Sequence, residues 1–203
     1  MHDGKTILIA TRNAGKLKEF QSFFAPWGWT VRGLGDYPDI PDVVEDGRTF
    51  LENARKKARA LYEWTNLPVL ADDSGLEVDA LDGEPGVYSA RYAGEGAGDE
   101  ANNAKLLAAL QGVPASRRQA RFRCVLVLII DDQRQLVAEG TCEGVILEQA
   151  RGEGGFGYDP LFYVPSLGKT LAELPAEEKN RMSHRGAALR QLAAQLADCQ
   201  FVP

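Results

Sequence analysis

The sequence of 203 residues contains few of the side chains that stabilise a fold covalently or through bound zinc. Its three cysteines, Cys124, Cys142 and Cys199, are odd in number, widely spaced and outside any paired motif. This usage disfavours a disulfide framework or a zinc site and is typical of reduced structural thiols. Two of them lie in segments that we expect to be strands.

Long apolar runs and an excess of positive charge are also missing. No run approaches the roughly 18 uncharged apolar residues of a membrane span, and the run near the N-terminus is too short for a secretory core. We therefore expect a cytoplasmic protein with no membrane partner. The formal net charge of -6 disfavours binding to nucleic acid, which depends on many Lys and Arg contacts, but it is compatible with a small anionic substrate.

Histidine is scarce, and His184 is the only one apart from His2. A lone histidine is more often structural than catalytic, and no Ser-His-Asp or Cys-His pattern is evident. The sequence has no repeat, low-complexity tract or linker, and 44% hydrophobic residues suffice for a full core. We therefore expect a single domain over residues 1–203, organised as two coupled lobes.

The hydrophobic pattern predicts alternating strands and helices, and hence an α/β fold. Thr49 and Glu52 form a predicted capping box at the start of one helix. Expected strands span residues 5–11, 29–34, 67–75, 119–131 and 135–148, with the last two as a hairpin closed near 131–135. Expected helices span residues 14–24, 49–64, 100–111, a stretch opened by Pro175, and 184–196.

Two adjacent carboxylates, Asp72 and Asp73, follow the apolar part of the third expected strand. Strand side chains alternate between faces, so a strand that continued unchanged would direct one of the two carboxylates into packed protein. Because burial of an unpaired carboxylate costs several kcal/mol, we expect either a turn, supported by Gly75, or a compensating cation. The pair is either a metal or general-base site, or a strand end with solvated acids.

The segment from Thr11 to Lys16 joins the first strand to the first helix. Free N–H groups and the positive end of the helix dipole favour anions at such a junction. Asn13 can cap the helix, Gly15 allows close approach of a ligand, and Lys16 adds a positive charge. The spacing is not that of a P-loop, and an ordinary capped turn with a surface lysine is the alternative.

The segment GGFGYDP, residues 154–160, has three glycines and two aromatic residues. It suits a loop whose rings stack on a flat ligand such as a nucleobase, or alternatively a turn with core aromatics. Arg185, next to His184, can donate hydrogen bonds to a carbonyl oxygen.

Six segments together resemble the inosine triphosphate pyrophosphatase family, the bacterial dITP/XTP pyrophosphatases, from about residue 6 to 196. They are TRNAGK (11–16), FLENARKKA (50–58), ADDSGLEVDALDGEPGVYSARYAG (71–94), ARFRC (120–124), GGFGYDPLF (154–162) and EEKNRMSHRGAAL (177–189). The resemblance implies a homodimer with a long central mixed β-sheet flanked by helices in two lobes, with the nucleotide cleft between them. It also implies Mg²⁺-dependent hydrolysis of noncanonical purine nucleoside triphosphates (ITP, dITP, XTP) to monophosphate and pyrophosphate, which cleanses the nucleotide pool.

The resemblance makes Asp73 the catalytic general base and a metal ligand. Asp72 is implied as a second ligand or an outer partner, and Glu45 as a further candidate, although Val44 stands where the family commonly has a paired acid. Mg²⁺ prefers carboxylate and phosphate oxygens, and Lys57 would help Lys16 to hold the leaving pyrophosphate. The implied substrate-binding residues are Thr11, Arg12, Asn13, Ala14, Gly15, Lys16, Ser74, Phe156, Gly157, Tyr158, Asp159, Lys179, His184 and Arg185.

Two other functions stay open at this stage. One is a Maf-type pyrophosphatase acting on modified or pyrimidine nucleotides, against which the segments SHRG and FGYDP argue. The other is a nucleotide sensor that does not hydrolyse its ligand, which is favoured only if Asp73 cannot hold a metal ion.

Overall fold

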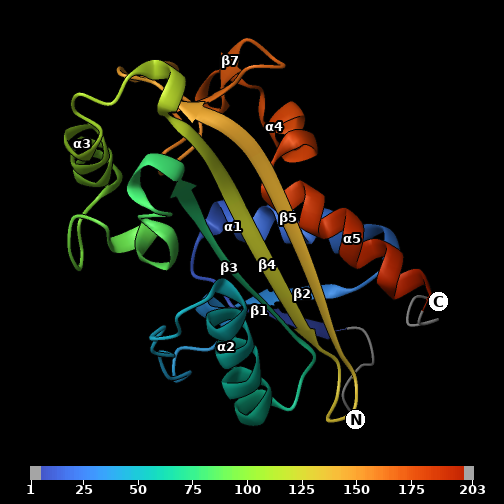
Figure 1. Ribbon diagram of the computed structural model, residues 1–203. Helices are drawn as coiled ribbons and strands as arrows, with labels where there is room; N and C mark the ends of the chain where they lie inside the picture. Colours follow the sequence, from blue (N-terminus) through green and yellow to red (C-terminus); the bar gives the residue numbers. More distant parts are fainter. Residues whose placement is uncertain (1–5, 199–203) are drawn as a thin grey trace. The chain divides into compact units, whose positions relative to one another are not determined.

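A computed structural model describes residues 6–198 (Figure 1). Seven strands form one mixed sheet in the order β2-β1-β3-β4-β5-β6-β7. The pairing of β1 with β2 and β3 is parallel, whereas that of β6 with β5 and β7 is antiparallel. The expected α/β class with a mixed sheet is confirmed. The strands are β1 (Thr6–Ile9), β2 (Thr30–Gly33), β3 (Val69–Val78), β4 (Gln119–Ile129), β5 (Gln135–Ile146), β6 (Phe162–Val164) and β7 (Lys169–Thr170).

The helices begin close to the predicted positions because their caps are present. Asn13 accepts a hydrogen bond from the Lys16 N–H at 3.0 Å, and Thr49 accepts one from the Glu52 N–H at 3.1 Å. The Glu52 carboxylate accepts from the Arg48 N–H, so this half of the expected capping box is displaced by one residue. The helices are α1 (Ala14–Phe24), α2 (Phe50–Thr65), α3 (Asp99–Ala109), α4 (Ala176–Met182) and α5 (His184–Asp198).

The chain forms two compact units. The first unit contains residues up to 73, 125–139 and those from 188, and the second unit contains residues 74–124 and 140–187. Figure 1 shows β4 and β5 as two long neighbouring strands, and β3, β4 and β5 each contribute residues to both units.

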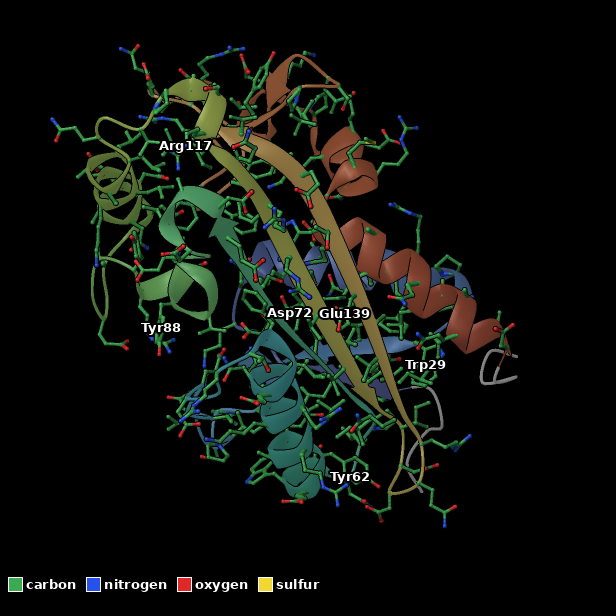
Figure 2. The ribbon with its side chains drawn as sticks, in the orientation of Figure 1. Trp29, Tyr62, Asp72, Tyr88, Arg117 and Glu139 are labelled. Atoms are coloured by element: carbon green, nitrogen blue, oxygen red, sulfur yellow. The ribbon has the colours of Figure 1, made fainter. Side chains whose placement is uncertain are left out.

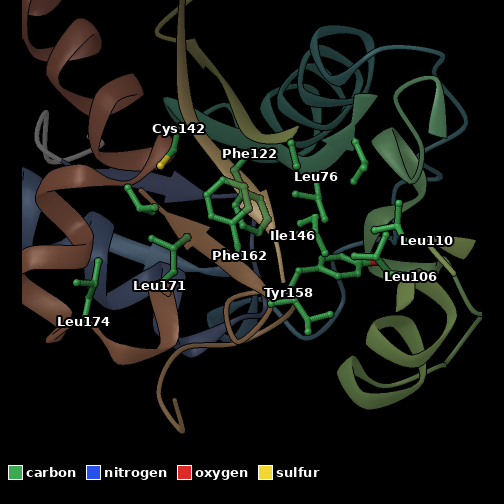
Figure 3. Close-up of a cluster of buried hydrophobic side chains, with 14 residues drawn as sticks. Leu76, Leu106, Leu110, Phe122, Cys142, Ile146, Tyr158, Phe162, Leu171 and Leu174 are labelled. Carbon is green, nitrogen blue, oxygen red and sulfur yellow. The ribbon is translucent and has the colours of Figure 1, made fainter. Parts of the chain in front are cut away.

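Each unit has a buried apolar core. In the first unit, the apolar face of α2 that contains Phe50, Ala54, Ala58 and Leu61 is buried, together with the apolar residues of β1. In the second unit, Phe122 and Phe162 pack with ring centroids 4.7 Å apart, and Tyr158 and Leu76 belong to the same cluster (Figure 3). Burial of a large apolar side chain contributes about 1.5–3 kcal/mol, so these clusters are the main source of stability in each unit.

The third strand differs from its prediction. No turn begins at Gly75, because β3 continues through both aspartates to Val78. The predicted turn is therefore wrong. The alternative expectation was a cation that compensates the buried carboxylate, and this cation is described below. Elsewhere, β1 ends at Ile9 rather than at residue 11, and the Gly-rich segment after residue 83 contains a 3-10 helix, Gly86–Arg91.

The remaining expectations concern the cysteines and membrane segments. Cys124 and Cys142 are buried in β4 and β5 as reduced thiols, and burial raises the pKa of the Cys142 thiol to about 11. Cys199 lies outside the described residues. Among residues 6–198, every helix is too short or too polar to cross a lipid bilayer.

Candidate functional site

Asp72 lies on β3 (Figure 2), and its side chain is only 2% exposed. Lys16, in the first turn of α1, donates from Nζ to Asp72 Oδ2 at 2.6 Å. The ammonium group offsets the charge of the buried carboxylate, which explains why the strand can continue through this position. The expected compensating cation is thus confirmed for Asp72, and the alternative of solvated acids is wrong.

Asp73 is the second buried carboxylate of β3, with 8% of its surface exposed. The pKa of its carboxyl is raised from 3.8 to about 6, mainly by burial and also by the nearby charges of Glu45 and Asp72. The Lys57 ammonium and the nearby side-chain amide of Asn53 lower the pKa but do not cancel the effect of burial. The first unit therefore holds a carboxylate whose negative charge is incompletely compensated.

Asn53 and Lys57 lie one helical turn apart on α2, and both interact with this part of β3. Lys57 Nζ donates to the Asp72 backbone oxygen at 2.6 Å and lies 3.1 Å from the Glu45 carboxylate. Asn53 Oδ1 accepts from the Gly47 N–H at 2.7 Å and so anchors the loop that follows Glu45. Asn53 was not predicted from the sequence, where its only signal is a polar residue on an apolar helix face, four positions before a lysine.

The donor set around Asp73 fits a hard divalent cation. Mg²⁺ is commonly bound by one or two carboxylates together with water and phosphate oxygens, and Asp73 with Glu45 offers this chemistry. Asp72 is already engaged by Lys16, which suits the role of an outer partner better than that of a ligand. Within residues 6–198, no cluster of three or more His, Cys, Asp or Glu side chains is arranged to hold a metal ion.

A pocket of about 340 Å³ opens in the first unit next to these groups. Its volume lies at the small end of the range of about 300–1,000 Å³ that is typical of ligand pockets. Lys16 and Lys57 make part of its wall basic, and Arg12 also lines it while pairing with Asp42 at 3.1 Å. The residues of the site that line the pocket are Thr11, Arg12, Lys16, Glu45, Lys57 and Asp72.

The turn before α1 is built around its cap. Thr11 Oγ1 accepts from the Asn13 N–H at 3.1 Å, and Ala14 is the first residue of the helix. A Cβ on Gly15 would lie 3.2 Å from Asn13 Oδ1, so the absence of a side chain keeps the cap unobstructed. The structure thus brings the predicted anion-binding turn and Asp72 together through Lys16.

The aromatic loop, residues 154–160, lies in the second unit. The Phe156 ring is 40% exposed, and Lys179 Nζ lies 4.5 Å from its centroid. Lys179 also pairs with the buried Asp159 carboxylate, which accepts from the Phe156 N–H at 2.8 Å. The Tyr158 ring is buried and its hydroxyl donates to the Ser89 oxygen, so Phe156 is the aromatic ring that can stack on a ligand.

His184 and Arg185 are buried at the start of α5. The His184 ring stacks on Phe122 of β4, with centroids 4.9 Å apart and planes inclined by 14°. This packing fixes the plane of the imidazole ring. Ser74, also in the second unit, is half-buried on β3 directly after Asp73.

A second, larger hollow of about 460 Å³ lies elsewhere in the second unit. Its charged groups largely bind one another: Arg91 pairs with Glu95 at 3.3 Å, and the Tyr92 hydroxyl donates to Glu84 at 3.2 Å. None of the site residues predicted from the sequence lines this hollow, so its larger volume does not make it the better candidate for the functional site.

Known proteins resemble this chain over almost its whole length. A family model described as the Ham1 family matches residues 7–195. Two curated relatives, both called dITP/XTP pyrophosphatase, are each 57% identical to this chain. The alignment with the protein of Desulforamulus reducens covers 91% of this chain and 92% of the relative, and that with the protein of Geobacillus kaustophilus covers 94% of each. The solved Ham1 protein of Staphylococcus aureus has a TM-score of 0.87 at 47% identity, covering 96% of this chain and 99% of its own. A HAM1 protein from Coxiella burnetii has a TM-score of 0.88 at 44% identity, with 95% and 98% covered.

Proposed function

The chain belongs to the Ham1 family, and from this premise we propose how its residues act on a nucleotide. The protein hydrolyses noncanonical purine nucleoside triphosphates, in agreement with the names of its relatives. Its substrates are ITP, dITP and XTP, and its products are the monophosphate and pyrophosphate. The single observation that carries the catalytic assignment is the buried carboxylate of Asp73 next to Lys57 and Glu45 in the first unit.

In the first unit, the turn from Thr11 to Lys16 binds the triphosphate. The N–H groups at the start of α1 and the charges of Lys16 and Lys57 neutralise phosphate oxygens and stabilise the leaving pyrophosphate. Asp72 orients Lys16 through their ion pair, which prevents the lysine side chain from sampling other rotamers.

Asp73 acts as general base and metal ligand, with Glu45 as an auxiliary ligand. In the metal-free protein its pKa of about 6 leaves the carboxylate ionised at neutral pH, so that it is available to bind a metal ion or to accept a proton from water. Bound Mg²⁺ supplies charge neutralisation at the phosphate and an activated water. The side-chain amide of Asn53 and the charge of Lys57 both favour the ionised form of Asp73.

In the second unit, Phe156 stacks on the purine while Arg185, with His184, donates to O6. Adenine carries an amino group at this position, so two donors would meet and both would be left unpaired. ATP is therefore expected to be a poorer substrate than ITP by roughly 10² in kcat/KM. Guanine shares O6, so discrimination against GTP is expected to be weaker.

We further propose that the protein is a cytoplasmic homodimer whose partner in catalysis is the small nucleotide, with no role for nucleic acid or a membrane. The net charge of -6 supports the absence of a role for nucleic acid, since a negatively charged protein is repelled by the phosphate backbone.

The decisive experiment is an assay of pyrophosphate release with Mg²⁺ over ITP, dITP, XTP, GTP, ATP and CTP. We expect release from the first three, weak release from GTP and little from ATP or CTP. Faster release of pyrophosphate from CTP than from the purine nucleotides would favour the Maf-type alternative. Binding of nucleotides without release of pyrophosphate would favour the sensor.

The role of Arg185 is tested by Arg185→Ala in the same panel. We expect kcat/KM for ITP and XTP to fall most, by roughly 10²-fold, so that their advantage over ATP narrows. An equal proportional loss for all triphosphates would instead identify Arg185 as a phosphate ligand.

A further inference from the structure

Both backbone groups of Gly157 in the aromatic loop are held by side chains of α3. The Gly157 N–H donates to Asp99 Oδ2 at 2.6 Å, and Asn103 Nδ2 donates to the Gly157 oxygen at 2.9 Å. Asp99 and Asn103 are four residues apart, so they project from the same face of the helix. The α3 residues lie more than 50 positions from Gly157 in sequence, so these two contacts form a specific tertiary clamp.

Gly157 needs such a clamp because of its conformation. Its φ of +62° lies in the left-handed region, where glycine has wide freedom of rotation. Its N–H belongs to the peptide plane shared with Phe156, and its oxygen belongs to the plane shared with Tyr158. Fixing both groups therefore fixes both peptide planes, and with them the direction in which the Phe156 ring leaves the backbone.

The rest of the loop is anchored independently of α3. Asp159 accepts from the Phe156 N–H, and the Tyr158 hydroxyl donates to the Ser89 oxygen in the core. The Asp159 N–H also donates to the Phe156 oxygen at 3.3 Å, whereas the Gly157 N–H and oxygen have their partners on α3. Loss of the α3 contacts would therefore leave the loop attached while weakening the hold on the direction of the Phe156 ring.

We propose that Asp99 and Asn103 are positioning residues that present the exposed Phe156 ring for stacking on the purine base. This inference rests on the proposed function and extends it to two residues that do not touch the ligand. It predicts that their loss weakens recognition of the base while leaving recognition of the phosphates unchanged.

Two isosteric substitutions separate this role from general damage to α3. Asp99→Asn keeps an oxygen that accepts from the Gly157 N–H, whereas Asn103→Asp removes the donor and places a carboxylate against the Gly157 oxygen. The matched control is Glu100→Ala, because Glu100 is also acidic and in the first turn of α3, so it reports the loss of helix-dipole stabilisation alone. Asp99→Ala provides a second disruptive variant should Asn103→Asp fail to fold.

The measurements are KM and kcat for ITP, the Kd of IMP by calorimetry, and the inhibition constant of inorganic pyrophosphate. For Asn103→Asp and Asp99→Ala we expect about tenfold increases in KM and in the Kd of IMP, from the loss of one hydrogen bond to the loop. The inhibition constant of pyrophosphate and kcat should change by less than about threefold. Asp99→Asn and Glu100→Ala should stay within about twofold of the wild type in every measurement.

The clamp is rejected if the disruptive variants bind IMP as tightly as Glu100→Ala does. It is also rejected if pyrophosphate inhibition weakens in step with IMP binding, since that would indicate general unfolding of the site. A wild-type protein that binds IMP but releases no pyrophosphate from ITP would contradict the proposed function, and the clamp would still be judged on IMP affinity.

Discussion

At the scale of single residues, two adjacent aspartates of one strand have different surroundings and therefore different uses. Asp72 has a direct ion pair with Lys16 at 2.6 Å, whereas Asp73 has only partial compensation and a pKa raised to about 6. A carboxylate already satisfied by a lysine is a poor base, and one with a raised pKa is a better one. This contrast is why we propose Asp73, and not Asp72, as the catalytic carboxylate.

Substitution Asp73→Asn tests this assignment. It removes the charge and the basicity while keeping the shape, so we expect kcat for ITP to fall by at least about 10²-fold with IMP binding still measurable. Asp72→Asn is the comparison, because it mainly disturbs the orientation of Lys16, the charge of Asp72 being the smallest contribution to the raised pKa of Asp73. It should therefore raise KM more than it lowers kcat. Near-normal turnover of the Asp73 variant, with loss in the Asp72 variant, would reverse the two roles.

The raised pKa of Asp73 also predicts a pH-dependent stability of the metal-free protein. The folded state binds this proton more tightly than the unfolded state, so its stabilising effect is complete below about pH 4 and is lost as pH rises through 6. A difference of about two pKa units corresponds to about 3 kcal/mol. Relative to Asp73→Asn, the wild type should therefore lose up to about 3 kcal/mol of unfolding free energy between pH 4 and pH 8.

Urea unfolding in the presence of a chelator measures this difference, and adding Mg²⁺ at pH 8 should restore stability to the wild type only. A free-energy difference between the two proteins that does not vary with pH would show that burial of Asp73 carries no penalty in solution.

Sequence reasoning at this scale found the residues with evident chemistry but not those that hold them. Residue type and spacing indicated the Asp72–Asp73 pair, the turn with Lys16 and the aromatic loop with Phe156, and the family resemblance singled out Asp73. Asn53 and Asn103 were not predicted, because an asparagine in a helix gives no sign of which distant backbone group it will bind. Their partners, Gly47 and Gly157, are defined only by the tertiary fold.

At the scale of elements, a buried arginine links the end of α3 to the strands. Arg118 donates to the Leu110 and Val113 oxygens, each at 2.9 Å, and to the Leu147 oxygen at 3.4 Å. The first two carbonyls follow α3, where a helix C-terminus leaves such groups without partners. The guanidinium thus satisfies carbonyl groups that would otherwise be buried unpaired.

Substitution Arg118→Met should lower the unfolding free energy by about 2–4 kcal/mol, since the carbonyls lose their donor while the aliphatic stem is kept. The neighbouring Arg117, which is exposed on the turn before β4 (Figure 2), provides the control. Arg117→Met should change stability by less than about 0.5 kcal/mol. Equal effects of the two substitutions in urea unfolding would contradict the capping role.

Element boundaries were predicted well where the signals are local and poorly where they are not. The start of α1 follows from the Asn13 cap, which lies within three residues of its partner. The length of β3 does not follow from its own residues, because Gly75 and the acidic pair suggest a turn. The strand continues because Lys16, 56 residues away from Asp72, supplies the missing cation.

At the scale of the whole molecule, the chain has two compact units that share three strands, and the coupling of the two lobes expected from the sequence stays a prediction. Each of β3, β4 and β5 has residues in both units. Loss of strand pairing in one unit is therefore expected to destabilise the continuation of the same strands in the other unit. All three tryptophans, Trp27, Trp29 and Trp64, lie in the first unit. Their fluorescence therefore reports the first unit alone, whereas far-ultraviolet circular dichroism reports both.

We expect the two signals to give the same urea midpoint, as cooperative two-state unfolding requires. The stronger test uses Arg118→Met. Arg118 and its partners Leu110, Val113 and Leu147 belong to the second unit, whereas all three tryptophans belong to the first. If the shared strands couple the units, this substitution should lower the fluorescence midpoint as much as the dichroism midpoint. A variant that loses dichroism at lower urea while its tryptophan transition stays at the wild-type midpoint would show that the units unfold separately.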